Sequence, residues 1–330
     1  MNDDGTRTVP FGVVDAFAAE PLAGTPVGVV TDAAGLGEEA MRALAREIGA
    51  GGTAFVRSTD DAGDDGGADR RMRYVSPAAA GEYGHERPGE RDGSPPPRAA
   101  LAVHARLLAD GRIDPGSHAV ETDAGVVDVA VLADGAVRTG IGDGAPRVDP
   151  VDLDYDRVGD ALGVDPAALR DVGADLPAAA AATPAADGPY LVVPVNFLER
   201  LGEADPAGDA LAALADDHDA AGVCAVTFDA LSADATLHAR WFVPEPSGGT
   251  TEVGATGATA GAAGAYLHAG DAFDDPPDEV RIEGGHFLDR PGVVRVRVTG
   301  EGVEVGGRAV AALDGRATLP ADDEDDIVVA

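Results

Sequence analysis

The chain has no lysine, one cysteine and one tryptophan, and only 4% of its residues are aromatic. All 24 basic residues are arginine, and 59 acidic residues oppose them, so the formal net charge is −35. This excess argues against nucleic acid or an anionic membrane as a partner, because both repel a negative surface. The lone Cys224 excludes an intramolecular disulfide and a multi-cysteine metal site, and its apolar neighbours predict a buried structural thiol.

The density of acidic residues predicts a protein adapted to a salt-rich cytoplasm, as in halophilic archaea. Close negative charges repel one another in dilute buffer, whereas the Debye length falls to about 3 Å near 1 M salt. We therefore expect the protein to lose structure on desalting. A disordered acidic chain is the alternative, but 45% of the residues are hydrophobic and recur at strand-like and helix-like spacings.

Targeting and membrane signals are missing from the sequence. The first residues, MNDDGTRT, are acidic where a signal peptide would be basic and then apolar. No apolar run approaches the roughly 18 to 20 residues that span a bilayer. These features predict a soluble, cytoplasmic protein.

Segments typical of a strand, a helix and a second strand follow one another twice along the chain. The first set is FGVVDAF from Phe11, EEAMRALAREI from Glu38 and TAFV from Thr53; the second is YLVVPVNF from Tyr190, DALAALADD from Asp209 and VCAVTF from Val223. Two α/β units are therefore expected, each long enough to bury a core.

A more specific repeat has a constant offset of 167 residues. RYVSP at 73–77 matches RWFVP at 240–244, and VVDVAV at 126–131 matches VVRVRV at 293–298. We infer a duplicated unit, with domains at 1–148 and 149–317 and an acidic tail at 318–330. Two similar domains would place a ligand site between them.

Several polar or Gly/Pro/Ala-rich segments are predicted to be loops. They are DDAGDDGGAD from Asp60, ERPGERDGSPPPR from Glu86 and DLPAAAAATPAAD from Asp175.

Two loops that precede small-residue helices contain the candidate ligand groups. The loop 254–261 is rich in glycine, and free amides at a helix start can bind a carboxylate or phosphate, although its glycines could equally serve close packing. At the matching place in the first half lie Gly84 and His85. His85 could donate to an anion or move a proton, or it could be an ordinary surface histidine.

Taken together, these motifs resemble the phenazine-biosynthesis-type (PhzF-like) isomerases. The resemblance rests on VDAFAAEPLAGTPVGVV, ALAREIGAGGTAFV, the RYVSP and RWFVPEP segments, ATGATAGAAGAYL and GVVRVRVTGEGVEVGGRAVAAL. It implies an α+β fold of the diaminopimelate-epimerase type, with two duplicated domains, each a mixed β-sheet curled round a central helix. It also implies a homodimer without cofactor or metal, in which a carboxylate moves a proton on a small carboxylated (anionic) metabolite.

The chain departs from the family pattern at its acids. Gly52 occupies the position of the family's catalytic glutamate, and Val253 occupies that of the acid in the second-domain motif. Ala258 replaces the serine of that motif, and Thr25 replaces an asparagine. The matches that remain imply His85 as the catalytic residue and Gly84, Glu252, Thr256 and Gly257 as substrate-binding residues.

Because these acids are missing, three possibilities remain for how the protein acts on its ligand. Another carboxylate, Glu82, Glu86 or Glu252, serves as the base; His85 does so; or the protein only binds an anionic ligand. A thiol enzyme built on Cys224 is disfavoured, because a nucleophilic cysteine needs an electropositive and partly exposed setting.

Overall fold

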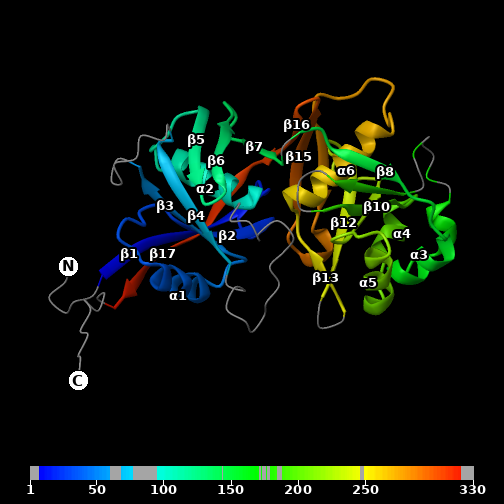
Figure 1. The fold of residues 1–330 in the computed structure, drawn as a ribbon, viewed down its shortest axis with the longest axis horizontal. Helices are drawn as coiled ribbons and strands as arrows, with labels where there is room; N and C mark the ends of the chain where they lie inside the picture. The colour runs from blue at the N-terminus through cyan, green and yellow to red at the C-terminus, as the bar shows by residue number, and fades with distance from the viewer. Residues whose placement is uncertain are drawn as a thin grey trace.

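The structure is a computed structural model that describes residues 7–59, 68–76, 95–142, 144–170, 172, 176, 179–183, 188–245 and 249–320. Its described part is an α+β fold in which 17 strands form one continuous mixed sheet. Figure 1 shows two halves side by side, and strands β7, β16 and β17 run between them. None of the described helices is long and apolar enough to cross a membrane.

The described residues of the first half form eight strands and two helices. They are β1 (Arg7–Ala16), β2 (Thr25–Val30), α1 (Glu38–Ile48), β3 (Thr53–Ser58), β4 (Arg70–Val75), α2 (Pro97–Ala109), β5 (Gly116–Thr122), β6 (Gly125–Val131), β7 (Val137–Ile141) and β17 (Ala309–Leu319).

The second half contains the remaining elements. They are β8 (Arg147–Pro150), α3 (Tyr155–Leu162), β9 (Ala180–Thr183), β10 (Tyr190–Pro194), α4 (Leu198–Gly202), α5 (Gly208–Asp216), β11 (Val223–Thr227), β12 (Leu237–Pro244), β13 (Thr250–Val253), α6 (Gly257–Ala269), β14 (Val280–Gly284), β15 (Gly292–Thr299) and β16 (Gly302–Gly307).

The two halves have the same sequence of strand pairings. In the first half the order is β17-β1-β2-β3-β4-β5-β6-β7, and in the second it is β8-β9-β10-β11-β12-β14-β15-β16. Both orders are antiparallel, antiparallel, parallel, antiparallel, parallel, antiparallel and antiparallel. β7 and β16, the last strands of the two orders, pair with each other and join the halves.

Each half packs its sheet around one buried helix. α2 contacts β1, β2, β7 and β17, whereas α6 contacts β9, β10, β15 and β16. Both helices are rich in alanine, and small side chains let strands approach on several sides. At Gly264 of α6, a Cβ atom would lie 2.5 Å from Cγ1 of Val296, so this packing requires glycine.

The final strand belongs by its pairing to the first half. β17 is hydrogen-bonded to β1 along its whole length, from Ala309 opposite Ala16 to Leu319 opposite Arg7. The sequence assigned residues 309–317 to a second domain, because an offset repeat does not reveal which strand a terminal segment joins. The boundary near residue 148 stays a prediction.

One predicted loop contains a strand. Within the Ala/Pro run from Asp175, residues 180–183 form β9, which pairs with both β8 and β10. Ala180 and Ala182 are fully buried. Alanine has little intrinsic strand preference, so the tertiary packing against α6 decides this element.

Candidate functional site

The first turns of α2 and α6 meet where the two halves join. A Cβ atom on Gly257, the first residue of α6, would lie 3.0 Å from Cβ of Pro97, the first residue of α2. The same atom would lie 2.9 Å from Val305 on β16. Glycine therefore permits this close approach, and the N-terminal ends of α2 and α6 lie next to each other.

The loop before α6 is attached to the first half by Thr25 on β2. The Thr25 hydroxyl donates a hydrogen bond of 2.8 Å to the carbonyl oxygen of Ala255. A Cβ atom on Gly254 would lie 3.3 Å from the same hydroxyl oxygen. Next to Thr25, the carbonyl oxygen of Pro26 would lie 3.7 Å from a Cβ atom on Gly51. The loop 254–257 thus lies beside the segment before β3.

Position 52, which the family resemblance assigns to a catalytic glutamate, has no room for a side chain. A Cβ atom on Gly52 would lie 1.9 Å from the hydroxyl oxygen of Tyr74 on β4. The φ angle of Gly52 is also +155°, a conformation that L-residues rarely adopt. The φ angle and the position of the Tyr74 hydroxyl therefore both disfavour a side chain at position 52.

The Tyr74 hydroxyl is fixed by two polar partners. Nη2 of Arg98 donates to it at 2.9 Å, and the hydroxyl lies 3.1 Å from the Gly51 carbonyl, to which it donates. The guanidinium carbon of Arg98 lies 5.5 Å from the centre of the Tyr74 ring, as in a cation–π contact. Arg98 is only 5% exposed. The pair therefore combines a buried cation with a half-buried phenol.

We call this set of contacting residues the interface ring. It consists of Thr25–Pro26 (β2), 51–52, Tyr74 (β4), 97–98 (α2) and 254–257. Tyr74 and Arg98 are its only ionisable side chains. Arginine keeps its proton in proteins, whereas a phenol is a group that can donate and accept one.

The sequence did not single out Tyr74 or Arg98. Tyr74 was part of a strand motif, and Arg98 ended a segment that we predicted to be a solvated loop. The structure corrects the latter prediction, since α2 begins at Pro97 and buries Arg98. No local pattern signals this pair, because the strand order alone brings β4 against the start of α2.

Of the residues predicted from the family motifs, Gly257 lies in the interface ring. Thr256 does too, but its side chain caps α6, accepting from the Thr259 amide at 3.3 Å and lying 2.7 Å from the Thr259 hydroxyl. Gly84 and His85 lie outside the described residues. Their predicted roles therefore stay predictions.

The predicted substrate-binding Glu252 has a different partner. Its carboxylate accepts two hydrogen bonds from Arg240, at 2.7 and 3.1 Å. Arg240 also donates to the carbonyl oxygens of Leu201 and Ala204. The next residue, Val253, points to the opposite face of β13 and packs in the core. Glu252 is thus engaged in a nearly buried ion pair.

A second buried polar cluster lies on β12 and β14. Glu283 accepts from Nδ1 of His238 at 2.9 Å and from the amides of Leu231 and Ser232. Burial acts to raise the pKa of Glu283, but these hydrogen bonds hold it below its usual value. The cluster fixes the 231–232 turn, so we assign it a structural role.

The thiol of Cys224 and the imidazole of His104 on α2 are both buried. Cys224 is fully buried, as predicted, and burial raises the pKa of its thiol to about 12. Burial lowers the pKa of His104 on α2 to about 4. At neutral pH both groups are therefore uncharged, and neither belongs to the interface ring.

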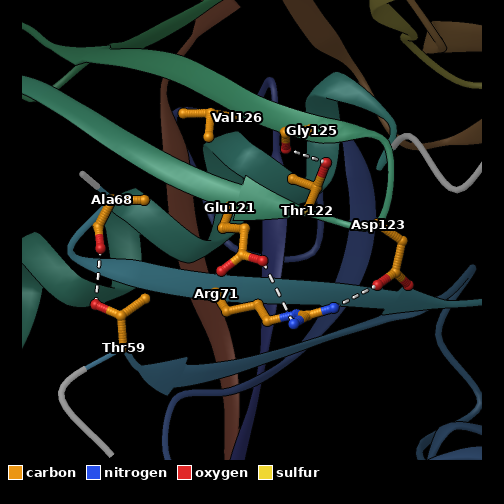
Figure 2. A pocket seen from close by; sticks show the side chains of 8 residues that line it. All are labelled: Thr59, Ala68, Arg71, Glu121, Thr122, Asp123, Gly125 and Val126. Atoms are coloured by element: carbon orange, nitrogen blue, oxygen red, sulfur yellow. Dashed lines mark hydrogen bonds and ion pairs between the residues drawn. The ribbon is translucent and has the colours of Figure 1, made fainter. Parts of the chain in front are cut away.

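A hollow of about 420 Å³ opens at the edge of the first half, away from the ring residues. Figure 2 shows that its polar side chains turn toward protein partners. Arg71 lies 3.4 Å from Glu121 and 3.3 Å from Asp123, and Thr59 donates to the Ala68 carbonyl. These internal pairs make the hollow a weaker candidate than the interface ring.

The comparison with solved structures defines the class of fold. The chain superimposes on a phenazine biosynthesis protein of the PhzF family from Bacillus anthracis with a TM-score of 0.76 and 24% identity, covering 94% of this chain and 99% of that one. A hydroxyproline epimerase from Agrobacterium vitis matches with a TM-score of 0.52 and 14% identity, covering 95% and 93%. The fold is therefore of the epimerase type.

The sequence comparisons define the family. The family model for phenazine biosynthesis-like proteins (PhzC-PhzF) matches residues 14–86 and 96–315, so the chain belongs to this family. It is 31% identical over 326 residues to the uncharacterized isomerase mll1393 of Mesorhizobium japonicum, covering 94% of this chain and 99% of that protein. The resemblance inferred from the motifs is thereby confirmed.

Proposed function

We propose that this protein is a cofactor-independent isomerase that moves a proton on a small carboxylated metabolite bound at the interface ring. It acts in the cytoplasm as a homodimer. The observation that supports this function is the buried Arg98 cation, located where elements of both halves meet. Guanidinium groups bind carboxylates strongly, because their N–H groups match the two carboxylate oxygens.

The interface ring also contains groups that stabilise the negative charge formed on the substrate in such a reaction. Removing a proton next to a carboxylate leaves negative charge on the substrate, and a fixed cation lowers the free energy of that state. The first turns of α2 and α6 add backbone amides that favour the same charge. In this proposal His85, which precedes α2 in the chain, moves a proton or donates to the anion, and Gly84, Thr256 and Gly257 contribute to binding.

A protein that only binds a small anion is the second candidate. It is favoured by the simultaneous replacement of two family acids by Gly52 and Val253. The space at Gly52 is filled by Tyr74, and Val253 is packed in the core. A binding protein would need the Arg98 cation but no group that transfers a proton.

Isotope exchange tests between these functions. The protein is incubated in deuterated buffer at high salt with L-alanine, L-proline, L-glutamate or but-3-enoate, and label is followed by NMR. An isomerase incorporates deuterium next to the carboxylate of at least one compound, and His85→Ala reduces the rate. Binding without label, seen as ligand-induced thermal stabilisation, supports the second candidate. If neither label nor binding is observed, both functions are contradicted.

We also propose that the two halves arose by duplication of one unit, with the boundary near residue 148. The matching order and direction of their strand pairings support this origin. In that case each half is a mixed sheet curled round its own central helix, and the first half is completed by β17 from the end of the chain.

A further inference from the structure

We propose that Tyr74 is a catalytic proton carrier of this site and substitutes for the carboxylate that position 52 lacks. The inference rests on the proposed isomerase function, which it makes specific. It begins from an elimination within the interface ring. Proton transfer needs a group that can both lose and regain a proton, and Arg98 does not lose its proton.

The other polar side chains of the ring are already engaged. The Thr25 hydroxyl donates to the Ala255 carbonyl, and the Thr256 hydroxyl caps α6. Glu252, the acid nearest in sequence to the ring, is paired with Arg240 on the opposite face of β13 from Val253. The Tyr74 hydroxyl is hydrogen-bonded as well, to Arg98 and to the Gly51 carbonyl. It is chosen among the described ring residues because a phenol is far more acidic than the aliphatic hydroxyl of a threonine.

The position of the hydroxyl matches this role. It occupies the space in which a side chain at position 52 would begin, at 1.9 Å from the ideal Cβ position. Tyr74 thus brings an ionisable oxygen to the place from which a residue-52 side chain would extend. Glycine at position 52 and tyrosine at position 74 are sterically interdependent. A larger residue at 52 would need the space that the phenol fills, and loss of the phenol would leave that space empty.

The charged groups around Tyr74 support proton transfer in both directions. Arg98 of α2 donates to the hydroxyl oxygen and offsets the negative charge of the phenolate form. The neighbouring Arg73 points to the other face of β4, where it pairs with Glu38 at 3.0 Å and Asp123 at 3.5 Å. The Gly51 carbonyl accepts the proton of the neutral form.

The proposed step conserves atoms and electrons. The phenolate oxygen, ionised by loss of its proton to water, takes the proton from the substrate carbon beside the carboxylate. The C–H bond breaks, the O–H bond forms, and the electron pair stays on the substrate, delocalised into its carboxylate. The phenol, whose proton exchanges with the solvent, then returns a proton on the same face of the substrate, to that carbon or to a carbon conjugated with it, which regenerates the phenolate without any oxidant or reductant.

Tyr74→Phe tests the inference, because the phenylalanine keeps the aromatic side chain over Gly52 and its contact with Arg98 but lacks the hydroxyl. We expect deuterium uptake by the panel of four acids to fall by about 10²- to 10⁴-fold, the usual contribution of a positioned acid or base. The matched control is Tyr155→Phe. Tyr155 on α3 contacts Arg170 at 5.4 Å in a similar pair remote from the ring, and uptake should change less than about twofold.

The outcomes separate the two proposals. No uptake by the wild-type protein contradicts the isomerase function and, with it, the role of Tyr74. Uptake that persists at the wild-type rate in Tyr74→Phe contradicts the role of Tyr74 alone. If Tyr74→Phe fails to fold, as judged by circular dichroism at high salt, Tyr74 is replaced instead by the more acidic 3-fluorotyrosine. A shift of the pH profile of deuterium uptake to lower pH supports the inference, and an unchanged profile overturns it.

Discussion

β4 and β12 have the same place in the two halves, yet their aromatic residues differ in chemistry. Tyr74 lies opposite Ala54, and 167 residues later Trp241 lies opposite Cys224 in the equivalent ladder. Trp241 is completely buried, whereas Tyr74 is half-buried and its hydroxyl binds Arg98. One framework therefore holds a core indole in one half and an ionisable group at the interface in the other.

The glycines before the adjacent strands are also constrained differently in the two halves. A Cβ atom on Gly222, before β11, would lie 2.7 Å from the backbone carbonyl of Phe242. The Cβ atom on Gly52, before β3, would instead meet a side chain, that of Tyr74. Backbone packing fixes glycine in the second half. In the first half, the identity of residue 74 determines whether position 52 can be filled.

The largest expected effect is unfolding of the protein on removal of salt. The same experiment tests whether the two halves unfold together. Desalting from about 3 M to 0.1 M KCl lengthens the Debye length from below about 3 Å to about 10 Å, so the net charge of −35 should unfold the protein. Because β7 pairs with β16 and β17 returns from the second half to pair with β1, fluorescence of the single Trp241 and circular dichroism should change in one transition. An unchanged melting temperature would refute the salt requirement, and two separate transitions would refute the coupling.

The next effect compares Arg240 with Arg73, its counterpart at the offset of 167. The side chain of Arg240 is 9% exposed and is paired with Glu252, which is 13% exposed, whereas the side chain of Arg73 is 39% exposed. Arg240→Ala should lower the free energy of unfolding by about 3–5 kcal/mol, because it leaves a buried charge unpaired. Arg73→Ala should cost about 0–1 kcal/mol. Urea unfolding at high salt measures both, and equal losses would contradict the difference between the halves.

The third prediction compares the histidines of the two central helices. Folding depresses the pKa of His104 from 6.5 to about 4, mainly through burial, whereas His268 is exposed on α6. The unfolded chain binds a proton that folded His104 rejects, so stability should fall between pH 6.5 and 4, by about 3 kcal/mol. His104→Leu should remove this part of the pH dependence. His268→Asn serves as the control, and an effect of the same size there would contradict the assignment.

The smallest effect tests the shared space of residues 52 and 74. Gly52→Ala should cost about 1–3 kcal/mol more than Gly116→Ala, because Gly116 has a similar φ of +154° but open surroundings. Thermal unfolding at high salt should show that Tyr74→Ala removes this difference. A difference that persists without the phenol would show that Tyr74 does not fill the space. By the same reasoning, glutamate can be restored at position 52 only together with a small residue at 74.

Much of the fold could be predicted from the sequence. The helix EEAMRALAREI was expected from apolar spacing and is α1, because Met41, Leu44 and Ala45 make one buried face. The repeated segments are β4 and β12, and β6 and β15. Residues 180–183 were misjudged, since alanine gives no strand signal, and the pairing of β17 with the distant β1 leaves no local trace in the sequence.

The sequence by itself determined the family, the two-part order of strands and helices, the excess of negative charge and the absence of the expected acids at Gly52 and Val253. Each of these depends on residue identity or on spacing along the chain. Only the tertiary structure decided that Arg98 is buried, that Glu252 is paired with Arg240 and that Tyr74 fills the space beside Gly52. These facts depend on contacts between strands and helices far apart in sequence, which the packing of the two halves creates.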